Sequence, residues 1–336
     1  MSASPERSFA MPGLAVELAE PATLAAQLAR TDTLAVFGFG ETSAPDTCVA
    51  EPRYLQVPLP PLDAPRLEVW RSAGVVRPGR DGEIAHADDG GLQFGWLELA
   101  EGHGGILDAS EQAYARLREF LGRSGFPHLL RIWNYFDAIT EGDGDGERYR
   151  QFCVGRVRGL GHVDASSLPA ATAIGTRTRR RRLQVYWLAA RNAGTPLENP
   201  RQTSAWRYPR QYGPQSPSFA RAMLPPNGSR LPLLLSGTAS IVGHASRHAA
   251  SLVAQLDETL ANLHSLLAAA RAQYAQLAPE FNAGSRLKVY VRDAADAGAV
   301  AHQLDLRLGR QVPRMLLQAD VCRPELRVEI EGMHGV

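Results

Sequence analysis

Two carboxylates near the end of the chain are the side chains whose pattern best suits chemistry. Glu329 and Glu331 alternate with the apolar Leu326, Val328 and Ile330, which predicts a β-strand with one apolar face and one charged face. A carboxyl group can act as a proton donor near neutral pH when an enclosed environment raises its pKa. A simpler interpretation is an edge strand whose polar face lies in water. The two interpretations differ in whether these carboxylates are buried.

Two other reactive side chains stand at fixed distances before Glu329. Arg314 lies fifteen positions earlier, on a short predicted strand, and Cys322 lies seven positions earlier. The planar fork of arginine pairs with a carboxylate through two hydrogen bonds, whereas a free cysteine is most often a small buried apolar residue. Lys288 is the only lysine of the chain. A coding bias explains this wealth of arginine equally well, so we choose the candidate substrate-binding arginines by their positions in the sequence motifs.

The spacing of Arg314 and Glu329 resembles the C-terminal signature of the Rid (YjgF) family. Residues 233–240 look like that family's first core strand with its Ser-Gly turn, residues 255–270 like its first helix, and residues 287–293 like its next strand. The resemblance extends from about residue 231 to the end. It implies an α+β unit that forms trimers with ligand pockets between subunits.

An earlier stretch of the chain repeats the same order of elements. We predict strands at 92–99, 130–136, 170–175 and 183–189, with helices from Asp108 to Gly122 and over 147–157. Gly95 and Tyr186 are 91 positions apart and Gly237 and Glu329 are 92 apart, so Tyr186 would take the place of Glu329. The alternative is a chance similarity between two ordinary α+β halves.

The predicted fold class is therefore α+β, with two Rid/YjgF-like units in one chain that form a pseudo-trimer. Strands expected at 34–40 and 67–70 would complete it. A trimer imitated by one chain is compatible with a monomer. The domain prediction is an N-terminal Rid-like unit with extra strands at 1–195, a linker that lines the site at 196–230, and a C-terminal Rid-like domain at 231–336.

Composition narrows the classes of protein. The 336 residues allow a large core and favour two units. A net charge of +1 argues against a nucleic-acid or membrane surface as main partner. Three widely spaced cysteines predict reduced thiols in a cytoplasm. Neither a signal peptide nor an apolar run of about eighteen residues is found, so we predict no membrane span.

The segment between the repeats is dense in aromatic residues, arginines and proline, which predicts a packed irregular loop. Together with residues 131–136, residues 147–156 and the C-terminal unit, it resembles the chorismatase family, enzymes that remove pyruvate from chorismate. This resemblance covers nearly the whole chain. It implies a cytoplasmic enzyme that binds chorismate and needs no metal or redox cofactor.

The chorismatase resemblance also implies roles for individual residues. Glu329 would be the general acid that protonates the enolpyruvyl ether, with Glu331 as the second choice. Cys322 is associated in the family with hydroxybenzoate formation. Substrate-binding candidates are Arg314 by the Rid spacing, Ala239 in the Ser-Gly turn, and Arg150, Arg156, Arg201, Tyr212 and Arg221 by the chorismatase-like segments.

The expected products are pyruvate with 3-hydroxybenzoate, 4-hydroxybenzoate or both. Alternatives are a chorismate hydrolase that yields a dihydroxycyclohexadiene carboxylate, an imine deaminase like simpler Rid proteins, and a non-catalytic small-molecule sensor. His244 and His248 stand four positions apart without a carboxylate cluster, so a capping or surface role is favoured over a metal site.

Overall fold

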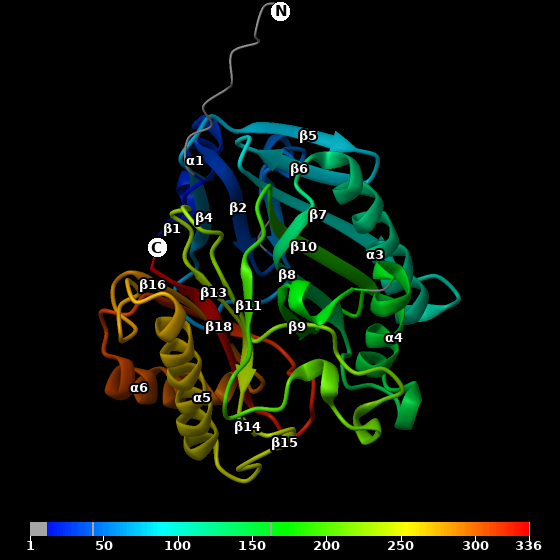
Figure 1. The fold of residues 1–336 in the computed structure, drawn as a ribbon, viewed down its shortest axis with the longest axis vertical. Coiled ribbons are helices and arrows are strands. Elements are labelled where there is room, and N and C mark those ends of the chain that lie inside the picture. Colours follow the sequence, from blue (N-terminus) through cyan, green and yellow to red (C-terminus); the bar gives the residue numbers. More distant parts are fainter. Residues whose placement is uncertain (1–11, 42–43, 162, 336) are drawn as a thin grey trace, which may run out of the picture.

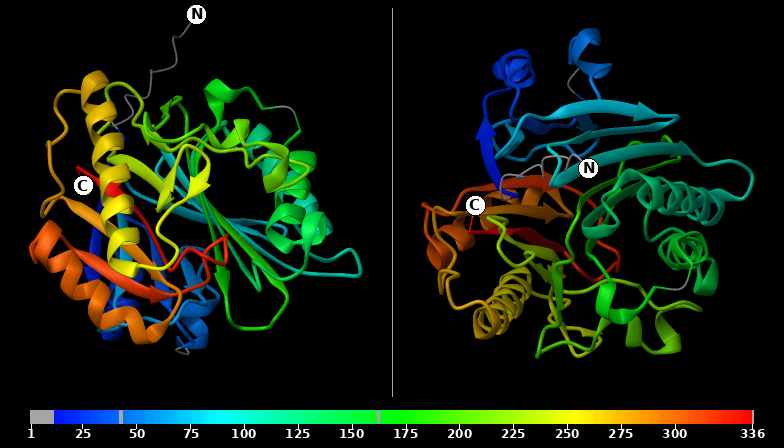
Figure 2. Two further views of the ribbon diagram at one scale, coloured as in Figure 1. Left: turned by 90° about the horizontal axis from the view of Figure 1, so that it is seen from below. Right: turned by 45° about the horizontal axis from the view of Figure 1, so that its top comes forward.

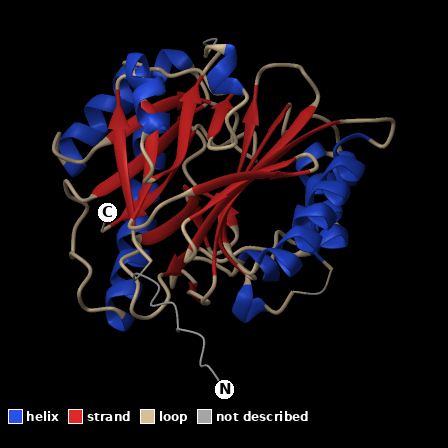
Figure 3. Cartoon of the chain, turned by 90° about the horizontal axis from the view of Figure 1, so that it is seen from above, coloured by secondary structure: helices blue, strands red, loops and turns tan. Residues whose placement is uncertain are grey.

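The computed structural model describes residues 12–41, 44–161 and 163–335. Strands form the interior and helices cover the outside (Figure 3), which confirms the α+β class. In the described residues the strands form one four-stranded sheet, two six-stranded sheets and a two-stranded ribbon. None of the helices described is long and apolar enough to cross a bilayer.

The middle of the chain forms the first six-stranded sheet, in the order β5-β6-β7-β10-β8-β9. Two helices pack on one face of this sheet (Figure 1). Strand β10 lies between β7 and β8 and is antiparallel to both, while β9 is parallel to β8. The elements are β5 (Arg77–Asp81), β6 (Ile84–Asp88), β7 (Leu92–Ala100), α3 (Gly105–Ser124), β8 (His128–Asp137), α4 (Arg148–Leu160), β9 (Ala170–Thr176) and β10 (Arg182–Ala190).

The C-terminal part repeats this arrangement, with the strand order β11-β12-β13-β18-β16-β17. Strand β18 lies between β13 and β16, as β10 lies between β7 and β8. The elements are β11 (Thr195–Leu197), β12 (Ala222–Leu224), β13 (Leu233–Ala239), α5 (Leu252–Gln273), β16 (Ser285–Val291), α6 (Ala297–Leu308), β17 (Arg314–Gln318) and β18 (Val328–His334), with the ribbon β14 (Ile241–Val242) and β15 (Ala245–Ser246).

The first part of the chain is a shortened third copy. Its sheet has the order β1-β4-β2-β3, with β4 antiparallel to β1 and β2, and β3 parallel to β2. Within the predicted 1–195 unit the strands thus divide between two sheets. The elements are β1 (Leu14–Ala19), α1 (Leu24–Ala29), β2 (Thr33–Phe39), α2 (Asp46–Val49), β3 (Tyr54–Val57) and β4 (Leu67–Ser72).

The three sheets share one central core, while their outer faces pack against helices (Figure 2). Phe37 and Trp70 from the first sheet, Tyr186 from the second and Tyr290 from the third are all fully buried there. Separate cores form under α1 and α2, under α3 and α4, and under α5 and α6. The chain thus folds as the predicted pseudo-trimer.

The strand that carries Glu329 and Glu331 is central, not an edge. Glu329 pairs with Ala239 of β13 on one side and with Tyr290 of β16 on the other. The exposed fractions of Glu329 and Glu331 are 6% and 1%. The polar face of this strand is buried because the second unit packs on it, so the interpretation as a wet edge strand is wrong.

Two details of the repeat differ from the prediction. Helix α3 begins at Gly105, three residues before Asp108, which lies in its first turn, where an acid also complements the helix dipole. Tyr186 lies in the central core, with its hydroxyl 3.3 Å from Lys288 Nζ, and Lys288 is 3.4 Å from Glu331. Tyr186 therefore shares the surroundings of Glu331 and not those of Glu329. A shift of two residues keeps a side chain on the same face, so alternation alone cannot fix this register.

Candidate functional site

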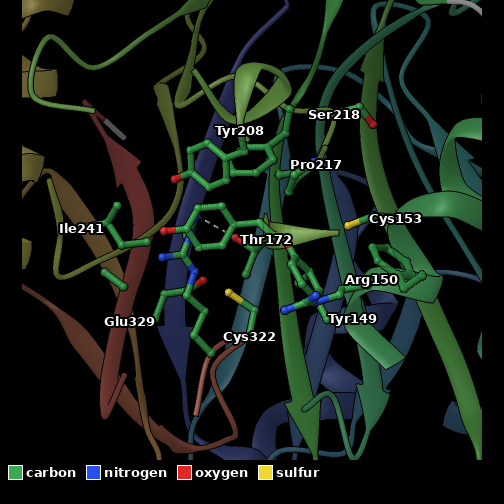
Figure 4. Close-up of a pocket in the computed structure, with 18 of the residues that line it drawn as sticks. Tyr149, Arg150, Cys153, Thr172, Tyr208, Pro217, Ser218, Ile241, Cys322 and Glu329 are labelled. Atoms are coloured by element: carbon green, nitrogen blue, oxygen red, sulfur yellow. Dashed lines mark hydrogen bonds between the residues drawn. The ribbon is translucent and has the colours of Figure 1, made fainter. Parts of the chain in front are cut away.

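A cavity of about 430 Å³ lies between two parts of the chain. One is the second unit, formed by β5–β10 with α3 and α4, and the other is the C-terminal unit, formed by β11–β18 with α5 and α6. Its walls come from helix α4, strands β9, β13 and β18, the irregular segment 208–221 and the loop 322–325. Figure 4 shows Glu329 and Cys322 in this cavity, with Tyr208 and Pro217 on one side and residues of α4 on another. Cavities of this size are typical of small-molecule sites.

The structure brings together seven of the nine residues predicted for the site. They come from four separate parts of the chain, and the linker contributes two of them. The seven that line the cavity are Arg150, Arg156, Tyr212, Arg221, Ala239, Cys322 and Glu329.

Arg314 and Arg201 lie elsewhere, which does not support the substrate-binding role predicted for them. Arg314 forms an ion pair with Asp305 of α6 and donates to the Gly309 carbonyl oxygen at 3.1 Å. It lies on β17, and β16 separates β17 from β18, so the fifteen-residue spacing does not bring it to Glu329. Arg201 donates to the Asn262 side chain at 2.9 Å and pairs with Glu258 at the surface.

Glu329 is buried in the cavity wall without a counter-ion, since no ion pair to it forms within the described part of the chain. Burial raises the pKa of this carboxyl to about 8, and the nearby charge of Glu331 adds to the effect. Gly237 makes room for the group, because a Cβ at position 237 would overlap the Glu329 carboxylate. The site therefore holds a carboxyl that is largely protonated at neutral pH.

Glu331 has the opposite surroundings, although it is also buried. Arg131 donates to it at 2.8 Å, the Trp133 indole donates at 2.7 Å, and Lys288 Nζ lies 3.4 Å away. Burial acts to raise its pKa, but Lys288 and Arg131 outweigh burial and the net pKa is lowered. The surroundings thus shift the pKa values of two carboxyl groups on one strand face in opposite directions, so that Glu329 is neutral and Glu331 is charged.

Two buried arginines line the cavity and have N–H groups without a described hydrogen-bond partner. Arg156 is 4% exposed and stacks over Tyr114 at 5.1 Å, and its Nε and Nη2 have no hydrogen-bond partner among the described residues. These two atoms form the edge of the guanidinium that pairs with a carboxylate. Arg221 donates through Nη2 to Tyr208 Oη at 2.8 Å, while its Nε has no described partner.

The other predicted residues shape the cavity. Burial, followed by the charge of Glu329, raises the pKa of Cys322 to about 12, so its thiol stays protonated. Tyr212 Oη lies 3.1 Å from His244 Nδ1, and the Arg323 guanidinium stacks over the Tyr212 ring at 4.1 Å. Arg150 lies 3.4 Å from Glu147. His248 pairs with Glu258 instead of joining His244.

Several lining residues were not singled out from the sequence. Tyr149 and Cys153 line the cavity from α4 together with Arg156, and their spacing of four and seven residues places all three on one helix face. That spacing could have revealed them. Thr172 lines the cavity from β9, but its position depends on how the second sheet packs against β13, and no local pattern reports this.

Comparison with known proteins gives a consistent result. The family described as "Chorismatase FkbO/Hyg5-like, N-terminal" matches residues 68–189. A chorismatase of Streptomyces hygroscopicus is 36% identical over 274 residues, which cover 79% of this chain and 78% of that protein. A 3-hydroxybenzoate synthase of the same species is 33% identical over 283 residues, 81% of this chain and 82% of that protein. A crystal structure of a chorismatase matches with a TM-score of 0.84 and 30% identity, over 97% of this chain and 100% of that chain.

Proposed function

Because the chain belongs to the chorismatase family, we propose that it converts chorismate into pyruvate and a hydroxybenzoate. The observation that carries this proposal is Glu329, a buried carboxyl with a pKa raised to about 8 that faces a cavity lined by arginines. A proton donor beside binding groups for anions is what an enol ether with two carboxylates requires.

Arg156 and Arg221 are the proposed binding groups for the carboxylates of chorismate. Both guanidinium groups are buried, and each has at least one N–H without a described partner. A buried donor of this kind is costly unless a ligand pairs with it. Arginine suits the task because it stays charged and its planar fork matches a carboxylate. The aromatic residues Tyr149, Tyr208 and Phe219 would enclose the ring of the substrate.

Glu329 would start the reaction as the general acid. Its proton passes to the methylene carbon of the enolpyruvyl ether, which leaves an oxocarbenium ion and an ionised Glu329. The C–O bond between ring and side chain then breaks, and the side chain leaves as pyruvate. The ring cation then loses a proton to aromatise, and this proton balances the one that Glu329 donated, so the outcome consumes no net water. The hydrolytic outcome consumes one molecule of water.

We propose 3-hydroxybenzoate, 4-hydroxybenzoate or both as the aromatic product. Support comes from Cys322, which lies in the cavity beside Glu329 with a protonated thiol, and from the 33% identity to a 3-hydroxybenzoate synthase. Ala239 is the register neighbour of Glu329 and bounds the same space. An imine deaminase that relies on Arg314 and Glu329 together is not favoured, because Arg314 is paired with Asp305 outside the cavity.

Incubation of the purified protein with chorismate, followed by chromatography, tests the proposal. We expect pyruvate and a hydroxybenzoate in equal amounts, and a Glu329→Gln variant that folds normally but turns over about 10²–10⁴-fold more slowly. A Cys322→Ala variant should shift products toward the dihydroxycyclohexadiene carboxylate. Unchanged chorismate with the wild-type protein would refute the function, and wild-type rates in Glu329→Gln would refute the assignment of the acid.

A further inference from the structure

A second carboxylate lies directly behind the wall of the cavity. Glu331 shares the face of β18 with Glu329 but does not line the cavity and is 1% exposed. Thr172 separates it from the cavity: its hydroxyl donates to the Glu331 carboxylate and accepts from the Gly237 N–H at 3.0 Å. The Thr172 hydroxyl has one proton, which it donates in the hydrogen bond to Glu331, so it cannot also donate to Glu329.

The nearby cations are bound to Glu331 and not to Glu329. Arg131 Nη2 is 2.8 Å from Glu331, and Lys288 Nζ is 3.4 Å away. Arg131 also donates to Thr172 at 2.6 Å, and Lys288 is shared with Glu68 at 3.2 Å. These contacts hold Glu331 as an anion. Its charge is fixed in the protein interior, where screening by water and salt is weak.

We propose that Glu331 is a positioning residue for the reaction: its fixed negative charge acts together with burial to keep Glu329 in the protonated form that donates to substrate. This inference rests on the proposed role of Glu329. Residues i and i+2 of a strand project from the same face about 6–7 Å apart, so an anion at 331 disfavours a second anion at 329. The pair differs from two equivalent acids because Glu331 has cationic partners that stabilise its ionised form, whereas Glu329 has no described ion-pair partner.

The other charged and titratable groups around Glu329 do not replace this effect. Arg131, Arg221 and Arg292 favour its ionised form and therefore oppose Glu331. The thiol and phenol groups nearby stay neutral because burial raises their pKa values. These groups are Tyr149 and Cys153 on α4, Tyr290 on β16, and Cys322 in the loop before β18. Tyr208 of the linker also faces the cavity.

The pH profile of kcat/KM for chorismate tests the proposal with Glu331→Gln. The wild-type rate should fall as Glu329 ionises on the alkaline side. In Glu331→Gln the fall should move to lower pH by about one unit, because the anion that opposes ionisation is gone. Glu331→Asp retains the charge and should restore the wild-type profile. An unshifted fall in Glu331→Gln would overturn the proposal.

Glu68→Gln is the matched control, since Glu68 is a buried carboxylate of the same Lys288 cluster that does not line the cavity. A purely structural role of the cluster predicts that both Gln variants lose stability and neither shifts the profile. If Glu331→Gln fails to fold, a double variant of Lys288→Met with Glu331→Gln keeps the cluster neutral and should show the same shift.

An infrared measurement separates this inference from the proposed function. The C=O stretch of a protonated Glu329 is obtained as the difference between wild type and Glu329→Gln. As pH rises, this band should be lost at a lower pH in the Glu331→Gln background than with Glu331 present. If Glu329→Gln keeps full turnover while the pH of band loss is still lowered by Glu331→Gln, the acid assignment fails and the charge effect stands. If the band is lost at the same pH with and without Glu331, the proposed role of Glu331 is wrong whatever the activity.

Discussion

Glu329 links the stability of the fold to pH because its carboxyl is buried without a counter-ion. Its pKa is about 8 in the folded protein, whereas an unfolded glutamate has a pKa of about 4.3. The folded state therefore binds this proton more tightly, and the resulting stability is fully present below about pH 4.3 and is lost as pH rises through 8. We expect Glu329→Gln to match wild type near pH 4.5 and to exceed its free energy of unfolding by about 2–5 kcal/mol at pH 9. Urea unfolding over this pH range measures the difference, and a difference independent of pH would contradict it.

Arg156 provides a second test at the scale of single residues. Its buried Nε and Nη2 edge has no described partner and is proposed to hold a carboxylate through two parallel hydrogen bonds. Lysine keeps the charge but not this geometry, so Arg156→Lys should raise KM for chorismate about 10-fold or more. Steady-state kinetics measures the effect.

Arg314→Lys and Arg201→Lys are matched controls, because both arginines lie outside the cavity and pair with Asp305 and Glu258. Their KM values should stay within about twofold of wild type. A larger effect at Arg314 than at Arg156 would return the binding role to the residue selected by the fifteen-residue spacing.

At the scale of elements, the sequence predicts the strands and helices well, but it does not predict which strands lie next to one another in a sheet. Apolar and aromatic runs predict β7, β8 and β10, and alternation predicts β18, each within a few residues of its observed bounds. Sheet order is a non-local property, however. Nothing in the spacing of Arg314 and Glu329 reveals that β16 separates their strands.

Helix α4 depends on a close approach to α3 to position its site residues. A Cβ at Gly155 would overlap the Leu107 carbonyl oxygen and the Ser110 side chain. Gly155→Ala should push α4 away from α3, which costs about 1–3 kcal/mol and raises KM, because Tyr149, Cys153 and Arg156 move with the helix.

Gly122→Ala is the control for this prediction. Gly122 lies on α3 with open space around it, so alanine should leave KM unchanged and stabilise the helix by about 0.5–1 kcal/mol. Thermal unfolding and kinetics on both variants separate the two effects. If Gly155→Ala behaves like Gly122→Ala, the close contact of the helices does not matter to the site.

At the scale of the whole molecule, the repeat was visible in the sequence but its third copy was not. The two longer units share the order of their elements, which a sequence comparison can detect. The first unit is shortened: its helices α1 and α2 have only six and four residues, and its strand β3 has four. These elements carry too little periodicity to be aligned. The sequence predicts that strands at 34–40 and 67–70 complete the pseudo-trimer, but the sheet order β1-β4-β2-β3 is what identifies this part as a third copy.

Lys288 joins all three units at the centre of the molecule. Its Nζ contacts Glu68 of the first sheet, the Tyr186 hydroxyl of the second and Glu331 of the third. Lys288→Met would leave two buried carboxylates without this cation, which costs about 3–5 kcal/mol. Since the sheets share one core, we expect calorimetry to give a single transition at lower temperature. Arg123→Met, which breaks the exposed pair with Asp81, should cost less than about 1 kcal/mol. Two separate transitions in Lys288→Met would mean that the units unfold independently.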